Sequence, residues 1–130
     1  MTVFSKIIAG EISSYKIAED ENFYSFLDIN PVAKGHVLVI PKQEIDYIFD
    51  LSDDTLAQMM LFSKKVAKAM SKVIKSKRIG IAVMGLEVPH AHIHLIPISE
   101  ESDMSFRNPK KKFSPEEFEA IARSIREAFE

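Results

Sequence analysis

The chain has 130 residues, which is enough for one domain with its own hydrophobic core and too few for two domains of ordinary size. Its 17 basic and 19 acidic residues give a formal net charge of −2, so no overall positive field exists to bind nucleic acid through its phosphates. Cysteine is absent, which excludes disulfides and thiolate metal sites and fits a reducing compartment. No stretch has the length of a membrane span, so we expect a cytoplasmic protein without membrane association.

The first forty residues are expected to form one short helix and three strands. Apolar residues at helical spacing in 3–8, followed by Gly10, predict a short N-terminal helix. Strands are predicted over 15–18 and 23–28, because the polar residues 19–22 between them are typical of a hairpin turn. After Asn30-Pro31 a third strand is predicted over 35–41, where Pro41 ends it.

A long helix is predicted from Ser52 to about Lys77. Ser52 is a suitable N-cap, and acidic residues follow it in the first turn, where the helix dipole favours negative charge. The apolar residues repeat at helical spacing and predict one buried face. This face comprises Leu56, Met59, Met60, Val66, Met70, Val73 and Ile74.

The second half of the chain predicts two more strands and a final helix. The strands are expected over 78–84 and 88–96, joined through Gly85. Residues 100–113 are polar, and their basic residues are interpreted as a solvated loop: Arg107, Lys110, Lys111 and Lys112. Ser114-Pro115-Glu116-Glu117 has the signature of a capping box. The helix after it has a predicted buried face of Phe118, Ile121, Ala122, Ile125 and Phe129. Strands in runs rather than in strict alternation with helices predict an α+β fold with a mainly antiparallel sheet.

Three of the four histidines stand at alternate positions in the last predicted strand. His90, His92 and His94 alternate with Ala91, Ile93 and Leu95. Since side chains of a strand point alternately to opposite faces, the three imidazoles are expected on one face and the apolar residues in the core. Imidazoles titrate near neutral pH, donate hydrogen bonds to anions, attack as nucleophiles and bind metals, so the functional site is expected here.

Three interpretations of this histidine row are open. The row is a polar strand face without function, or it is a zinc site, or it performs covalent phosphoryl or nucleotidyl transfer. Residues i and i+4 of a strand lie about 13 Å apart, so zinc would need a further ligand such as His36 or Glu87. In the third interpretation the central imidazole attacks phosphorus while its neighbours bind the phosphate oxygens, and no cofactor or metal is required.

The segment 90–96 resembles the signature of the histidine triad (HIT) nucleotide hydrolases and transferases, His-φ-His-φ-His-φ-φ with φ apolar. Residues 4–12, Phe-Ser-Lys-Ile-Ile-Ala-Gly-Glu-Ile, are similar to the N-terminal segment of that family. Residues 26–31 and 35–42 resemble its first core block, so the resemblance extends over most of the first hundred residues. It implies the HIT-like fold: a mainly antiparallel five-stranded sheet with one long central helix and a C-terminal helix. We expect a single domain over 1–130, with its core at about 1–99 and a C-terminal loop and helix at 100–130.

The resemblance also implies the chemistry. A purine nucleotide would be hydrolysed at its α-phosphorus, with His92 as the nucleophile that forms a nucleotidyl-histidine intermediate. His94 and His36 would bind the phosphate, and His90 would support the row. Asp28 would bind the ribose hydroxyls, and the purine would lie among Phe4, Ile7 and Leu27. The family resemblance further implies a homodimer whose two sheets join across the interface.

One segment departs from the family pattern. Many members have a glycine-rich loop and a Gln-Ser or Gln-Thr pair before the triad, whereas here Leu86 and Glu87 occupy those places in a shorter segment. Strand parity points Glu87 away from the histidine face unless a bulge at Pro89 re-aims it. Glu87 therefore makes a structural contact or, as the alternative hypothesis, stays protonated in the site and gives a proton to a departing amine.

The leading functional prediction is a phosphoramidase that releases AMP or GMP from an amine. Diadenosine polyphosphate hydrolysis is the second candidate within the family, and uridylyl transferases are much longer chains. A nucleotide-binding regulatory module with little catalysis is the alternative from another class.

Overall fold

The computed structural model describes all 130 residues. Five strands form one antiparallel sheet in the order β1-β2-β3-β5-β4. They are β1 (Lys16–Glu19), β2 (Phe23–Leu27), β3 (Val37–Pro41), β4 (Arg78–Ala82) and β5 (Ile93–Ile98). The helices are α1 (Val3–Ile8), α2 (Asp53–Val73) and α3 (Pro115–Ala128), with short 3-10 turns at Ile48–Asp50 and Glu101–Met104. The predicted α+β fold with a five-stranded antiparallel sheet, a long helix and a C-terminal helix is confirmed.

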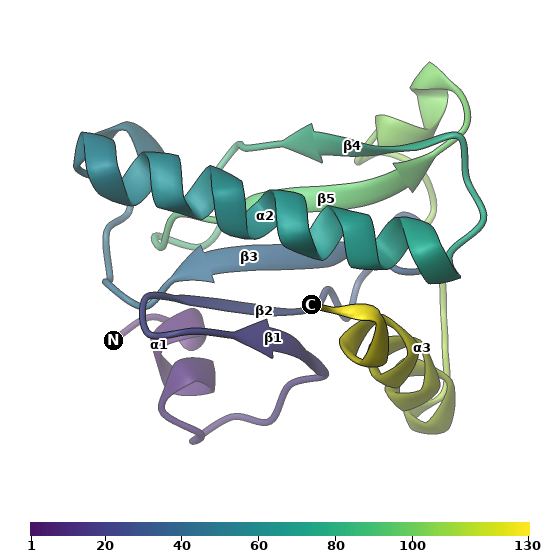
Figure 1. Ribbon diagram of the computed structural model, residues 1–130, viewed down its shortest axis with the longest axis horizontal. Coiled ribbons are helices and arrows are strands. Elements are labelled where there is room, and N and C mark those ends of the chain that lie inside the picture. Colours follow the sequence, from purple (N-terminus) through teal and green to yellow (C-terminus); the bar gives the residue numbers. More distant parts are fainter.

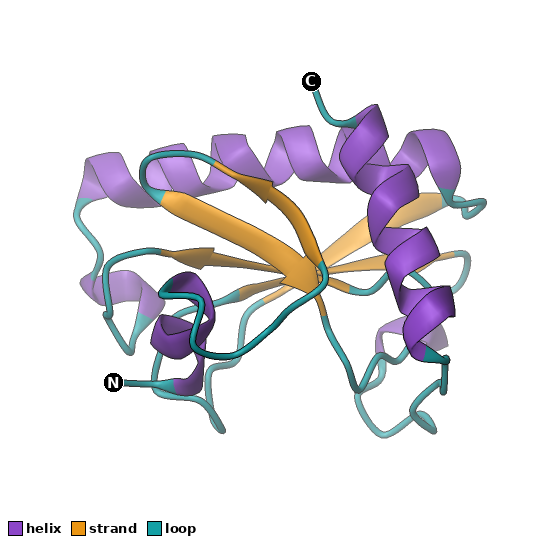
Figure 2. Ribbon diagram, turned by 90° about the horizontal axis from the view of Figure 1, so that it is seen from below, coloured by secondary structure: helices purple, strands orange, loops and turns teal.

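The two faces of the sheet are covered by different helices. Helix α2 lies across one face, with α3 beside it over β1 and β2, and α1 lies on the other side (Figures 1 and 2). The main core between the sheet and α2 and α3 contains 20 buried residues, among them Ile93 and Leu95 of β5. A smaller cluster joins α1 to the opposite face through Phe4, Phe26 and Leu38. Because Leu38 pairs with His94, the His94 side chain lies on the α1 face.

Helix α2 begins as predicted and ends earlier. The Ser52 hydroxyl accepts a hydrogen bond from the Thr55 amide at 3.1 Å, as an N-cap does. The helix ends at Val73 rather than near Lys77, because Ile74 has extended backbone angles and Lys77 already donates its amide to the Ile98 carbonyl beside β5. Two members of the predicted buried face, Met60 and Val73, are exposed, so that part of the prediction was wrong.

Helix α3 confirms its predicted capping box, in which the Ser114 hydroxyl accepts from the Glu117 amide and the Glu117 carboxylate accepts from the Ser114 amide. Its predicted face is buried in the main core through Phe118, Ile121, Ala122 and Ile125, whereas Phe129 lies beyond the helix and is partly buried.

The prediction that the histidine strand begins at Val88 was wrong by five residues, since β5 begins at Ile93. The Ala91 amide donates to the Ile45 carbonyl at 2.7 Å, and the His90 amide donates to the Val88 carbonyl, so residues 88–92 do not pair with the sheet. The predicted division of side chains still holds, because Ala91, Ile93 and Leu95 are all in the main core. Both sides of this segment are buried, so it is not the half-buried strand that the alternation suggested.

The turn before β3 depends on Gly35, and β3 begins at Val37 rather than at Gly35. Gly35 has φ of +84°, and a Cβ there would lie 2.6 Å from Cδ1 of Ile74. Glycine therefore allows the chain to turn in close contact with Ile74 at the end of α2. The turn places His36 directly before the start of β3. None of the helices has the length and apolar character needed to cross a membrane.

Candidate active site

Three of the four histidines, His36, His92 and His94, border a cavity of about 510 Å³ on the α1 face of the sheet. Segments far apart in the sequence line it: the N-terminal segment, the β2–β3 connection, the β4–β5 loop, the triad and the chain after the second 3-10 turn. Its size is in the range of small-molecule sites. Its polar and ionisable lining includes Asp28, His36, Glu87, His92, His94 and Lys110.

His92 presents a free ring nitrogen at this cavity. Its Nδ1 lies 2.8 Å from the backbone carbonyl oxygen of His90. A carbonyl oxygen only accepts, so Nδ1 carries the proton and the neutral ring has its lone pair on Nε2. Nε2 has no hydrogen-bond partner within the chain, and the Phe4 ring packs edge-on against His92 at 5.1 Å between centroids. His92 is therefore held in the tautomer that a nucleophile requires.

His36 and His94 form a hydrogen-bonded pair with a defined direction. The Val32 amide donates to His36 Nδ1 at 3.2 Å, which places the proton of a neutral His36 on Nε2. His36 Nε2 then donates to His94 Nδ1 at 2.9 Å, so the proton of a neutral His94 is on its Nε2. His94 thus has a free N–H donor for a phosphate oxygen. Both nitrogens of His36 are occupied, so its effect on a phosphate would pass through His94.

Both rings of this pair are neutral at pH 7. Burial lowers the pKa of His36 to about 4; the negative charge of Asp28 opposes the shift and the positive charge of Lys110 adds to it. Burial also lowers the pKa of His94 to about 3, with further contributions from the charges of His36, His92 and Lys110. The 3.6 Å contact between His36 Nε2 and Asp28 Oδ2 is therefore not an ion pair between full charges at neutral pH.

His90 lies behind the other two rings and does not line the cavity. Its side chain is fully buried, its Nε2 donates to the Pro41 carbonyl at 2.8 Å, and its Nδ1 lies 2.8 Å from the Thr2 hydroxyl. Burial lowers the His90 pKa, although the hydrogen bond to Pro41 opposes this. Nδ1 of the neutral ring accepts a hydrogen bond from the Thr2 hydroxyl. The two hydrogen bonds, to Pro41 and from Thr2, clamp the His90 ring in place, which suits a supporting role.

The carboxylate of Glu44 holds Thr2, the residue that donates to His90. Glu44 Oε1 accepts hydrogen bonds from the Thr2 amide at 2.9 Å and from the Ser5 hydroxyl. These two bonds, with the Ser5 bond the stronger cause, lower the pKa of Glu44. The contacts join the segment after β3 to the start of α1 and, through Thr2, to His90.

Asp28 and the three apolar residues predicted to contact the nucleoside all line the cavity. Asp28 Oδ1 accepts from the Asn30 amide at 2.8 Å, so this carboxylate does cap the turn while its other oxygen faces His36. Phe4, Ile7 and Leu27 all line the cavity. The structure thus brings together the predicted ribose and purine residues with His92 and His94.

Glu87 lines the same cavity as His92 and His94, and its side chain is exposed. The prediction that strand parity turns it away was wrong, because the segment before Ile93 is not a strand.

Two further residues of the cavity were missed by the sequence. Phe106 packs edge-on against His94, with 4.8 Å between ring centroids, and Lys110 lines the cavity beside it. The Lys111 amide donates to the Pro31 carbonyl at 2.8 Å, which ties this loop to the β2–β3 connection. Lys110 is exposed, as expected for a solvated loop, and it also borders the cavity. An aromatic residue alone in a polar loop was the only local signal.

This arrangement of residues includes one candidate metal site. The ligand atoms of Asp28, His36 and His94 lie within 4.8 Å of one another, so the set combines one histidine of the row with His36, one of the two further ligands that were expected, and not with Glu87. Two of these atoms, His36 Nε2 and His94 Nδ1, are joined by the 2.9 Å hydrogen bond. Zinc would need the lone pair of each nitrogen directed at it, so binding would require this bond to break.

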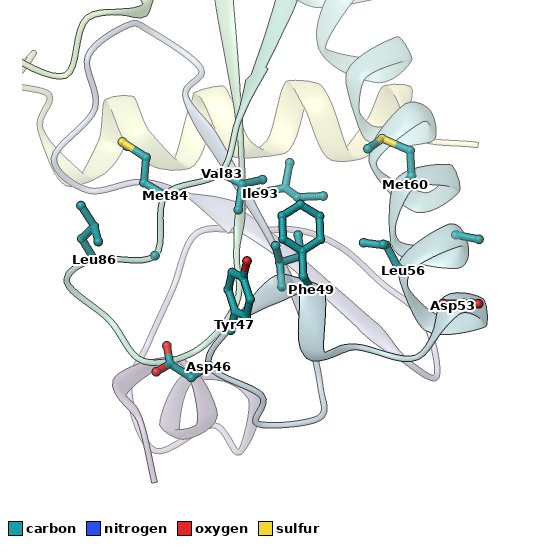
Figure 3. Close-up of a pocket in the computed structure, with 13 residues that line it drawn as sticks. Asp46, Tyr47, Phe49, Asp53, Leu56, Met60, Val83, Met84, Leu86 and Ile93 are labelled. Carbon is teal, nitrogen blue, oxygen red and sulfur yellow. The ribbon is translucent and has the colours of Figure 1, made fainter.

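A second, larger cavity of about 820 Å³ contains no histidine. Figure 3 shows Phe49 between Val83 at the end of β4 and Leu56 and Met60 of α2. Its lining is mostly apolar, with Asp46 and Asp53 as the charged members. The predicted histidines line the other cavity, which is therefore the candidate active site.

Comparisons with known proteins identify the family of the chain. The model of the HIT domain matches residues 9–101. The adenosine 5'-monophosphoramidase of Schizosaccharomyces pombe is 36% identical over 128 residues, which cover 95% of this chain and 94% of that protein. A hypothetical histidine triad nucleotide-binding protein from Sulfolobus tokodaii superimposes with a TM-score of 0.82 at 31% identity, covering 96% of this chain and 89% of the other. A zinc-bound histidine triad family protein from Mycobacterium smegmatis has a TM-score of 0.81 at 32% identity, over 97% and 91% of the two chains. The chain belongs to the histidine triad (HIT) family.

Proposed function

We propose that this protein hydrolyses a purine nucleoside phosphoramidate, or a related nucleotide conjugate, at its α-phosphorus and releases AMP or GMP. Relatives named adenosine 5'-monophosphoramidase, in two yeasts besides S. pombe, support a HIT-type hydrolase. The observation that carries the proposal is the tautomer of His92, whose Nδ1 proton is bound by the His90 carbonyl so that Nε2 is free at the cavity.

The first step forms a bond between His92 Nε2 and the α-phosphorus and breaks the bond from phosphorus to the leaving nitrogen. The electron pair of the broken bond stays with the amine, which takes up a proton from solvent, either directly or through Glu87. Both nitrogens of His92 are then substituted, and the positive ring is stabilised by its Nδ1–H bond to the His90 carbonyl. The His94 N–H donates to a non-bridging oxygen, where negative charge builds up in the transition state.

The second step returns the enzyme to its starting state. Water attacks the phosphorus, the bond to Nε2 breaks, and its electron pair returns to the imidazole. The proton of the water leaves to solvent, and the nucleoside monophosphate is released. No step needs a metal or an external cofactor, and water is the second substrate.

The remaining cavity residues accommodate the nucleoside. Phe4, Ile7 and Leu27 offer apolar surface to the purine, and Asp28 accepts hydrogen bonds from the ribose hydroxyls. A carboxylate that accepts both hydroxyls would favour a ribonucleotide over its deoxy form. A cytoplasmic location is part of this proposal.

A fluorogenic adenosine phosphoramidate tests the proposal. We expect turnover by the wild type and a loss of at least about 10³-fold in His92→Ala, with AMP binding retained. A rapid quench should trap AMP on the peptide that contains residues 90–94. Turnover that persists undiminished in His92→Ala contradicts the mechanism, and tight AMP binding by a wild type without turnover indicates the binding module instead.

We also propose a homodimer that joins two sheets at β4. This strand is an edge of the sheet, so its outer N–H and C=O groups are free to pair with another chain. The apolar cavity of Figure 3 lies beside it, and large side chains there are exposed: Phe49 by 70%, Tyr47 by 56% and Leu86 by 90%. Contiguous apolar surface of this kind marks an interface. The segment 84–86 lines both this cavity and the histidine cavity, so a second copy would stand next to the active site.

Sedimentation measures the dimer directly. The wild type is expected at twice the chain mass of 14.7 kDa, and Phe49→Arg is expected at one chain mass. Glu21→Arg introduces the same side chain into the β1–β2 turn at the far edge of the sheet and should leave the dimer intact. A wild-type monomer at micromolar concentration would refute the proposed assembly.

A further inference from the structure

A single cationic side chain lines the histidine cavity. Lys110 is the only lysine or arginine among the lining residues, and Asp28 and Glu87 are the two carboxylic acids. His36 and His94 are neutral at pH 7, because burial lowers the pKa of each ring. A phosphate in this cavity would therefore find neutral donors and negative charge unless Lys110 contributes.

Lys110 is held at the histidine end of the cavity. Its Nζ donates to the Phe106 carbonyl at 2.8 Å and lies 5.8 Å from the centroid of the Phe106 ring. That ring is in edge contact with both His94 and His36, at 4.8 and 5.9 Å between centroids. The loop is anchored next to the β2–β3 connection by the bond from the Lys111 amide to the Pro31 carbonyl.

The ammonium group has donors to spare. A lysine has three N–H donors, and the Phe106 carbonyl takes one of them. Two remain for oxygens of an anion without loss of the bond that positions the side chain. The charge of Lys110 also acts on both rings of the pair, since it contributes to the lowered pKa of His36 and of His94.

We propose that Lys110 is a substrate-binding residue, which contacts the phosphate of the nucleotide and selects anionic ligands over the neutral nucleoside. The inference rests on the proposed function, because it assumes that the nucleotide occupies the histidine cavity. Lys110 and His94 both donate to phosphate oxygens, and the Phe106 ring, which contacts both side chains, sets their relative position. Conjugates that carry more negative charge next to the α-phosphorus gain most from this contact.

Binding of AMP and of adenosine separates this role from that of a solvated surface lysine. In isothermal titration, Lys110→Gln should weaken AMP binding by about tenfold and leave adenosine binding within about twofold of the wild type. Lys110→Arg should restore most of the AMP affinity, because it returns the charge. Lys112→Gln removes a charge from the same loop outside the cavity lining and is the matched control, with an expected change below about twofold.

Turnover and salt give independent readouts. Lys110→Gln should raise KM for the phosphoramidate with little change in kcat, and added salt should weaken AMP binding more in the wild type than in the variant. Equal AMP affinity in Lys110→Gln and the wild type overturns the inference, as does an equal loss for AMP and adenosine. If the wild type hydrolyses the phosphoramidate while either of these results holds, only the role of Lys110 is wrong. If the wild type neither binds AMP nor turns over the conjugate, the proposed function itself is wrong.

Discussion

The backbone carbonyl of His90 accepts the Nδ1 proton of His92 across 2.8 Å, although the two residues are separated by only one position. The bond is possible because this segment has left the sheet, where a carbonyl would pair with a neighbouring strand. The His90 ring, clamped between Pro41 and Thr2, fixes the position of that carbonyl. The tautomer of His92 is thus set by backbone geometry.

Thr2 should influence catalysis without contact with substrate. Thr2→Val removes the hydroxyl that donates to His90 Nδ1 and also accepts from the Ser5 amide as the N-cap of α1. We expect kcat to fall by about 3- to 10-fold, AMP affinity to stay within about twofold, and stability to fall by about 1 kcal/mol. Thr2→Ser keeps the hydroxyl and should restore both properties. An unchanged kcat in Thr2→Val would separate the clamp from catalysis.

Glu87 is expected to act on the leaving group. If its carboxyl group gives the proton to the departing amine, Glu87→Gln should slow substrates with basic amine leaving groups by about 10²-fold and spare those with acidic phenol leaving groups. Steady-state kinetics over a series of leaving groups measures this. The same loss for every substrate would show that Glu87 does not serve as the acid.

Stability should decrease as the pH falls through the range in which unfolded histidine titrates. The unfolded rings bind protons below about pH 6.5, whereas burial keeps folded His36 and His94 neutral down to about pH 4 and about pH 3. Between these values the unfolded state holds more protons, so the free energy of unfolding falls with falling pH. We expect a loss on the order of 1–2 kcal/mol for each ring between pH 7 and pH 5, measured by urea denaturation. His36→Gln should have a shallower pH dependence than the wild type, and equal slopes would disprove this origin.

Ser25 offers a stability test away from the site. Its hydroxyl is fully buried in β2 and is the only buried side-chain N or O atom without a hydrogen-bond partner. Ser25→Ala removes this unpaired group and should raise the free energy of unfolding by about 1 kcal/mol, seen as a higher urea midpoint with an unchanged m-value. A lower midpoint would mean that the hydroxyl is satisfied in solution, for example by a bound water.

The sequence predicted those features of the site that depend on local order. Alternation placed Ala91, Ile93 and Leu95 in the core, and the capping residues Ser52 and Ser114 begin their helices as expected. These features are predictable because burial follows the alternation of side chains along a strand, and because an N-cap contacts a residue only three positions later. Where the elements end was less predictable. β5 begins five residues later than the alternation suggested because the Ala91 amide pairs with Ile45, a residue 46 positions earlier.

By itself, the sequence determined the fold class, the spacing of the triad and its placement opposite the main core, since periodic burial and short-range capping encode them. Only the tertiary structure decided which nitrogen of each ring is free, that His36 is hydrogen-bonded to His94, that Glu87 lines the cavity, and that Lys110 lines it too. These properties come from contacts between residues far apart in the chain, such as Val32 with the triad partner His36 and Lys111 with Pro31. No local pattern records such contacts, because the direction of a hydrogen bond depends on where the folded backbone places its donor and acceptor.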